Sequence, residues 1–208
     1  MLSKPKSALA AMLLALLLAV LLAAPPLDAQ HGARVLHRNL AQLVGDSHVI
    51  VIGRVTSVRP EVHPKYSNLN TVLVTVDVSE VLKGHAGVQY TFRLALLHPT
   101  DFKTKLGYAG GQEVMLMLTQ PHPETGFSSP AGLEQGRFQI VTDASGSRVA
   151  VNGMNNAGLF RNIAKVAPKL DANLAGMPAR QLLTQHNSGP IAYDQLKSVI
   201  QTLVASSN

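Results

Sequence analysis

The sequence predicts a mostly β protein of the α+β class. We expect a small five- to six-stranded antiparallel OB-like barrel, with a short N-terminal helix and C-terminal helices. Two observations lead to this fold class. Segments rich in β-branched residues follow one another without helical crossovers, which excludes parallel βαβ units. After residue 30, helical spacing of apolar residues occurs only before the first strand and after the last one.

Residues 1–29 have the layout of a secretory signal peptide. Two lysines precede an apolar run over residues 8–24, and two prolines and a short polar exit follow it. The run is close to the ~20 residues that span a bilayer, so an uncleaved anchor is the alternative. In both cases we expect an extracytoplasmic protein, periplasmic or secreted. Membrane contact is expected only through residues 8–24, if they stay attached.

The composition excludes several classes of function. The chain has no cysteine, which rules out disulfides, thiol catalysis and cysteine-held metals. Its net charge is +6, but the basic residues are spread singly, and tryptophan is absent. Nucleic-acid binding needs a clustered basic face, often with aromatic platforms. We therefore expect no nucleic-acid partner.

The segment 46–59 is the strand around which the barrel is expected to form. Its β-branched run, residues 49–52, suits a buried strand. Gly53 leaves a gap in one face, and the apolar phase slips afterwards, which predicts a bulge near Thr56 or Ser57. Such a strand bends sharply, as strands at barrel corners do.

The other elements follow from periodicity and turn residues, and they divide the chain into a barrel domain (30–151) and a segment (152–208) whose helices pack on it. Helices are expected over Arg34–Val44, ended by Gly45, from Pro178 to Gln185, and after Ser188. Pro60 should end the first strand. Further strands are expected over Thr71–Lys83, Val88–Leu96, Val114–Leu118 (covered on both faces), Gly136–Thr142 and Arg148–Val151. Residues 120–132 are predicted to form a mobile loop.

Four segments in order carry a family resemblance: Ser47–Val55, Val76–Gly84, Gly110–Leu118 and Gly132–Ile140. Together they resemble uncharacterised exported bacterial proteins and the netrin/TIMP-like OB-fold barrel. The resemblance covers roughly residues 35–142 and implies the fold. TIMPs inhibit metalloproteases through an N-terminal cysteine, and this chain has none. The resemblance therefore implies neither that activity nor any functional residue.

Three histidines are the weak candidates for chemistry. His63, His98 and His122 each precede a proline in a loop between predicted strands. If these loops gathered at one end of the barrel, the three rings could hold a metal. No His-x-His or His-x-x-x-His pair is present, and no Gly-x-Ser-x-Gly elbow or carboxylate pair stands out. We therefore assign no catalytic residue, metal or cofactor from the sequence.

These observations favour an exported, non-catalytic binding module that takes a protein, a peptide or a cell-envelope polymer. Its surface is expected on the first three strands and on the loops Pro60–Asn70 and His98–Gly111. The alternative is an exported metal-dependent hydrolase that uses the loop histidines. A third possibility is a structural subunit of an envelope assembly, which predicts an exposed apolar patch on the last helix.

Overall fold

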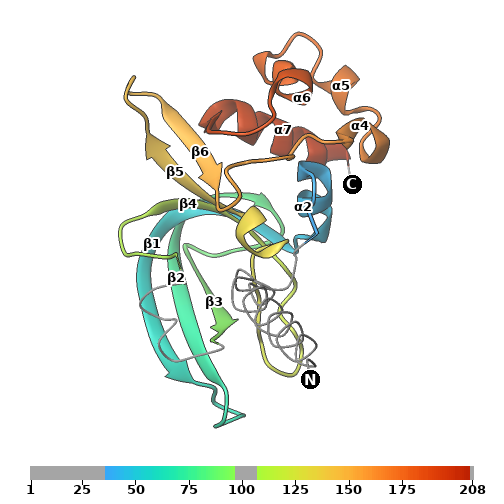
Figure 1. The fold of residues 1–208 in the computed structure, drawn as a ribbon. Helices are drawn as coiled ribbons and strands as arrows, with labels where there is room; N and C mark the ends of the chain where they lie inside the picture. Colours follow the sequence, from blue (N-terminus) through green and yellow to red (C-terminus); the bar gives the residue numbers. More distant parts are fainter. Residues whose placement is uncertain (1–35, 97–106, 207–208) are drawn as a thin grey trace, which may run out of the picture. The chain divides into compact units, whose positions relative to one another are not determined.

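The structure, a computed structural model, describes residues 36–96 and 107–206, and its main feature is one antiparallel sheet with helices on one side (Figure 1). The strand order is β3-β2-β1-β4-β5-β6-β7. The strands are β1 (Val49–Val62), β2 (Asn70–Lys83), β3 (Gln89–Ala95), β4 (Glu113–Leu118), β5 (Arg137–Thr142), β6 (Arg148–Asn152) and β7 (Ile191–Ala192). The mostly β class is confirmed. The strands form an open sheet of seven, not a closed barrel of five or six.

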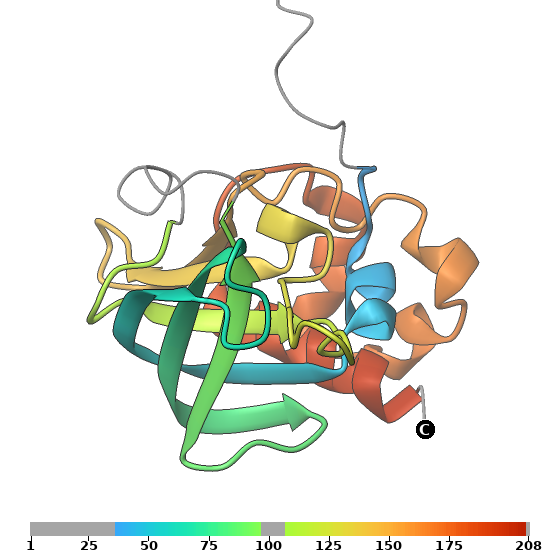
Figure 2. The ribbon, with the colours of Figure 1, turned by 90° about the horizontal axis from the view of Figure 1, so that it is seen from below.

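The helices of the described residues lie before β1 and after β6, as the sequence predicts (Figure 2). They are α2 (Leu40–Asp46), α4 (Ile163–Val166), α5 (Leu170–Asn173), α6 (Leu182–Gln185) and α7 (Tyr193–Ser206), with the short 3-10 turns η1 (Leu133–Gln135) and η2 (Pro178–Gln181). The expected helix from Pro178 to Gln185 is present as η2 followed by α6. The turns α4 and α5 lie where no regular element was expected. The short strand β7 occupies the start of the helix expected after Ser188, and that helix, α7, begins only at Tyr193.

Helix α2 begins later than the predicted start at Arg34, and residues 36–39 are not helical. Asn39 caps the helix: its side chain accepts the N–H of Gln42, and the Gln42 side chain accepts the N–H of Asn39. This reciprocal capping box fixes the start of the helix. Gly45 was expected to end the helix, but it lies within it. Ser47 follows the last helical residue, and its hydroxyl donates a hydrogen bond of 2.6 Å to the carbonyl of Leu43.

Strand β1 bends and changes register, as predicted. Its pairing with β2 shifts at three places, one of them between Val55 and Ser57, so the expected bulge is confirmed. Pro60 does not end the strand, because β1 continues to Val62. β4 pairs with β1 as far as Arg54, and Val55 still exchanges backbone hydrogen bonds with Gly111 and Gln112. Beyond Val55, no strand of the described residues pairs with this edge of β1. A proline, which lacks an N–H, is tolerated at such an edge.

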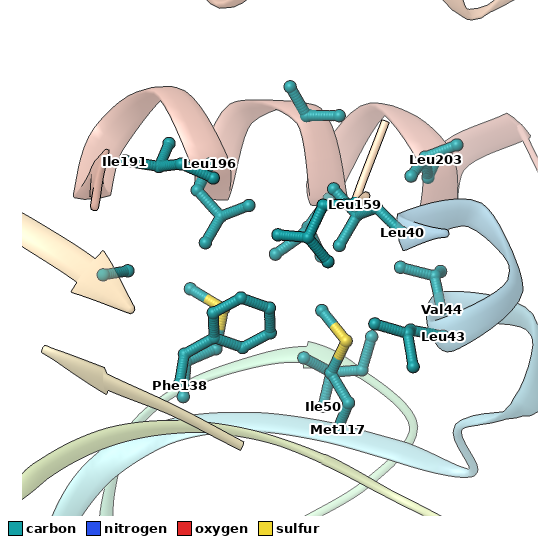
Figure 3. Packing of buried hydrophobic residues seen from close by; sticks show 14 of the residues in the cluster. Leu40, Leu43, Val44, Ile50, Met117, Phe138, Leu159, Ile191, Leu196 and Leu203 are labelled. Atoms are coloured by element: carbon teal, nitrogen blue, oxygen red, sulfur yellow. The ribbon is translucent and has the colours of Figure 1, made fainter. Parts of the chain in front are cut away.

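Two hydrophobic cores lie on opposite faces of β1 and β4. Val49 and Val51 face a cluster shared with β2 and β3, whereas Ile50 faces a larger cluster shared with the helices. Figure 3 shows side chains of the sheet, including Phe138, opposite Leu196 and other residues of the helices. Each fully buried aliphatic side chain contributes about 1.5–3 kcal/mol. The continuous apolarity of residues 114–118 is thereby explained, since all of them are buried.

Helix α7 is the main cover of the larger core. Its buried residues are Tyr193, Leu196, Val199, Ile200 and Leu203. An ion pair between Lys197 and Glu80 of β2, at 2.6 Å, joins its outer side to the sheet. The apolar stripe of α7 is therefore covered, and it does not form the exposed patch that a structural-subunit role predicts.

A buried amide network holds the irregular chain after β6. Asn156 is fully buried, accepts the N–H of Asn152, and donates to the carbonyls of Ala150 and Gly189. Asn152 in turn donates to the carbonyl of Gln135. Buried backbone groups need partners, and here side-chain amides supply them where no strand or helix does.

Replacing Gly53 with alanine should destabilise the protein. A Cβ at Gly53 would lie 2.1 Å from the carbonyl oxygen of Asp77, so the β1–β2 pairing must shift. We expect a loss of about 1–3 kcal/mol in urea unfolding. The matched control is Gly45→Ala in α2, where a Cβ would meet nothing within 4 Å and should be neutral or stabilising by up to about 1 kcal/mol. Equal stability of the two variants would contradict the assigned role of Gly53.

Asn156→Asp should also destabilise the protein, because the carboxylate cannot donate to the carbonyls of Ala150 and Gly189. Leaving buried acceptors unpaired costs about 1–3 kcal/mol, with more for a buried charge. Asn155→Asp is the control, since Asn155 is an exposed neighbour with the same left-handed backbone. Thermal unfolding measures both variants. A melting temperature of Asn156→Asp equal to that of the control would exclude a structural role for the network.

Candidate ligand-binding loops

His63 is the residue on which two loops meet. It follows β1 directly and is 4% exposed. Its Nδ1 accepts the backbone N–H of Lys65 at 3.1 Å and of Tyr66 at 3.0 Å. Nδ1 is therefore unprotonated, and Nε2 carries the proton that it donates to the carbonyl of Thr125 at 2.8 Å. One neutral ring thus shapes its own loop and binds a second one.

The two loops are the β1–β2 connection, residues 63–69, and the segment after β4, residues 119–127. Further contacts join them on the outside. The Lys65 ammonium lies 2.8 Å from the Glu124 carboxylate, and the Tyr66 hydroxyl donates to the same carboxylate at 3.4 Å. The His63 ring meets the Phe127 ring edge-on, with centroids 5.7 Å apart. Segments far apart in sequence therefore present one continuous surface.

The Lys65–Glu124 pair is the most accessible part of this surface. The two side chains are 59% and 64% exposed. Their mutual hydrogen bond lowers the pKa of Glu124 and raises the pKa of Lys65, so both stay charged around neutral pH. An ion pair in water is readily exchanged for contacts with other polar groups. The pair therefore offers a donor and an acceptor side by side.

A second, less exposed ion pair lies behind the loops. Arg93 of β3 lies 3.2 Å from Glu61 near the end of β1, and the side chains are 20% and 29% exposed. Ser128 donates its N–H to the carbonyl of Arg93 at 3.0 Å. The Arg93 Nε is buried, and it has no hydrogen-bond partner among the described residues. The Arg93–Glu61 pair thus joins β3 to the end of β1 behind the loops.

The structure places the candidate histidines as follows. His63 uses both ring nitrogens in the contacts above. His122 lies exposed in the second loop, where its Nδ1 accepts the N–H of Glu124 at 3.3 Å. His98 lies outside the described residues. In the part of the chain that the structure describes, no group of three or more His, Cys, Asp or Glu side chains is placed to hold a metal ion.

In the described part of the expected His98–Gly111 surface, Tyr108 is half-buried, whereas residues 107 and 109–111 are exposed. The Tyr108 ring packs on Phe92 with centroids 5.8 Å apart, and the Arg137 guanidinium lies 4.9 Å from the centre of the same ring. Burial raises the pKa of the Tyr108 hydroxyl. Tyr108 thus belongs to the core between β1, β2 and β3.

The residues that sequence reasoning missed lie in the expected mobile loop. Thr119 donates its N–H to the carbonyl of Ser129, and the Ser128 hydroxyl donates back to the carbonyl of Thr119 at 2.8 Å. The N–H of Gly126 donates to the carbonyl of His122, and Gly126 has a positive φ of 66°. The Thr-Gly pair before Phe127 was the available signal for a tight turn.

Comparisons with known proteins returned no match among protein families, curated proteins or solved structures. Within the described residues, no helix is both long and apolar enough to cross a membrane.

His63→Ala should release the two loops from each other. The N–H groups of Lys65 and Tyr66 then lose their acceptor, and we expect their hydrogen exchange to accelerate by roughly tenfold or more. His122→Ala, on the exposed face of the second loop, should leave those amides unchanged. Exchange followed by mass spectrometry measures both variants. Unaltered protection in His63→Ala would show that the loops are held by other contacts.

Proposed function

We propose that this protein is an exported, non-catalytic binding module whose ligand surface is formed by the two loops that His63 joins. The observation that carries the proposal is the hydrogen bond from His63 to Thr125, which brings residues 63–66 and 122–127 into one surface. A rigid scaffold that positions polar loops is the usual arrangement of a binding site.

Strand neighbours support a netrin/TIMP-like, OB-type interpretation of the scaffold. The segment 127–131 makes an antiparallel bridge to the end of β4 at Leu118 and a parallel bridge to β3 at Arg93. A neighbour order of β1, β2, β3, this segment and β4 fits an OB barrel, and β4 also pairs with β5. Isolated bridges take the place of a fifth strand here, so the barrel remains incomplete.

The positions of the two loops fit this interpretation. In OB-folds, the loops between strands 1 and 2 and between strands 4 and 5 bind oligonucleotides and oligosaccharides. Residues 63–69 connect β1 to β2, and residues 119–126 connect β4 to the segment 127–131. The sequence-derived loop at Pro60–Asn70 is thus retained as part of the proposed surface. In the proposed surface, the loop of residues 119–126 takes the place of the expected His98–Gly111 loop, because residues 97–106 lie outside the described residues.

The polar groups favour a peptide, a protein or a cell-envelope polymer as the ligand. Lys65 and Glu124 supply opposite charges, and Tyr66 adds a half-buried aromatic ring. Because the single accessible lysine is neutralised by its partner, nucleic acid is a poor fit. The alternative, a metal-dependent hydrolase, gains less support, since the His63 nitrogens are already hydrogen-bonded.

Exchanging the charges of the loop pair tests the proposal. Lys65→Glu combined with Glu124→Lys keeps an ion pair but reverses the field that a ligand meets. We expect binding to immobilised peptidoglycan fragments, lipopolysaccharide or envelope proteins to fall by roughly tenfold. Surface plasmon resonance and quantitative mass spectrometry of the retained material measure the loss.

The matched control exchanges Asp171 and Arg180, a pair of similar exposure at 2.7 Å in the helical part. Binding should survive this exchange. If neither the original protein nor the control variant retains any envelope component, the loops are not the binding surface. The same conclusion follows if the two charge exchanges weaken retention equally. N-terminal sequencing of the purified protein tests the proposed export, because cleavage should expose the chain near residue 30.

A further inference from the structure

Three basic side chains of the helical part have no acidic partner in the part of the chain that the structure describes. Arg161, Lys165 and Lys169 are exposed, and no ion pair joins them to a carboxylate among the described residues. Some other basic residues are paired: Arg180 lies 2.7 Å from Asp171, and Lys197 lies 2.6 Å from Glu80. Arg54, Arg59 and Lys83 have no ion pair among the described residues either, but they do not follow one another along one segment. Among the described residues, the segment around α4 therefore carries three unpaired basic side chains close together in sequence.

Two hollows open beside these residues, between α2 and the chain of α4 and α5. The first, of about 320 Å³, is lined by polar groups that include His37, Arg161 and Lys165. The second, of about 310 Å³, is lined mainly by apolar groups that include Ala41 and Leu170. α2 lies beside α4 and α7, so the two hollows share one wall (Figure 1).

Val166 lies where the two hollows adjoin, and we call the pair of hollows the cleft. Val166 lines both of them, and it is 52% exposed, so its side chain is accessible from both hollows. Lys169 lines the apolar hollow as well, close to its opening. No carboxylate of the described residues lines either hollow. The cleft thus has a cationic half and an apolar half.

We infer that this cleft binds a free, single-chain anionic amphiphile, with the anionic group between Arg161 and Lys165 and the apolar chain running past Val166 into the second hollow. Charge complementarity selects an anion, since no carboxylate of the described residues pairs with these basic side chains. The apolar lining selects a ligand with a hydrocarbon part. This site is independent of the loops around His63.

The dimensions favour a small amphiphile over a protein segment. Small-molecule sites occupy roughly 300–1,000 Å³, and the two hollows together lie in that range. A stable protein interface needs a continuous face of roughly 800 Å² on each partner. The described cleft is a pair of hollows rather than such a face.

Isothermal titration calorimetry with dodecanoate tests the inference. The protein is used in the form that the cell produces, and dodecanoate is kept below its critical micelle concentration. We expect dodecanoate to bind, and dodecyltrimethylammonium and butyrate not to bind, because one reverses the charge and the other lacks the chain. Lys165→Glu should weaken dodecanoate binding by roughly tenfold. Val166→Trp should weaken it as well, by filling the junction of the two hollows.

Arg59→Glu is the matched control, because Arg59 is an exposed basic residue on β1, outside the cleft. It should leave the affinity unchanged, and circular dichroism establishes that each variant is folded. Equal binding of the cationic amphiphile, or full affinity in both cleft variants, would overturn the inference. Binding to phosphatidylglycerol vesicles or to an acidic leucine-bearing peptide without binding of free dodecanoate would overturn it too, in favour of a membrane or a peptide partner.

Discussion

The burial of β1 and β4 on both faces is the constraint on which the rest of this protein depends. Ile50 packs toward the helices, and its neighbours Val49 and Val51 pack toward β2 and β3. A strand that is apolar on both faces is stable only when both faces are covered. The helices after β6 are therefore structurally required, because they exclude water from one side of the central strands.

To cover both faces, the chain includes segments without regular secondary structure. Polar side chains stabilise these segments by hydrogen bonding to their backbone groups. Asn152 and Asn156 bond backbone groups that no ladder reaches, and Gln135 accepts the N–H of Arg38, 97 positions away. His63 does the same for the β1–β2 connection. His63, a candidate metal ligand in the sequence, is thus a hydrogen-bond partner of backbone groups in the structure.

The two proposed sites arise in different ways from this architecture. The loops around His63 are rigid at their base and exposed at Lys65 and Glu124, so polar ligands can replace an ion pair in water. The cleft at Val166 exists because short helical turns cover the core incompletely. One site relies on exchange of hydrogen bonds, and the other relies on unpaired charge beside apolar surface.

The sequence by itself determined the local elements: β1 with its bulge near Thr56, the doubly buried strand at 114–118, and helices at the ends of the described chain. Periodicity and glycine chemistry carry that information because they act between near neighbours. Only the tertiary structure decided that the sheet stays open and that His63 is a buried residue whose hydrogen bonds connect two loops. Its partner Thr125 is 62 positions away, and no local pattern encodes a hydrogen bond across that separation.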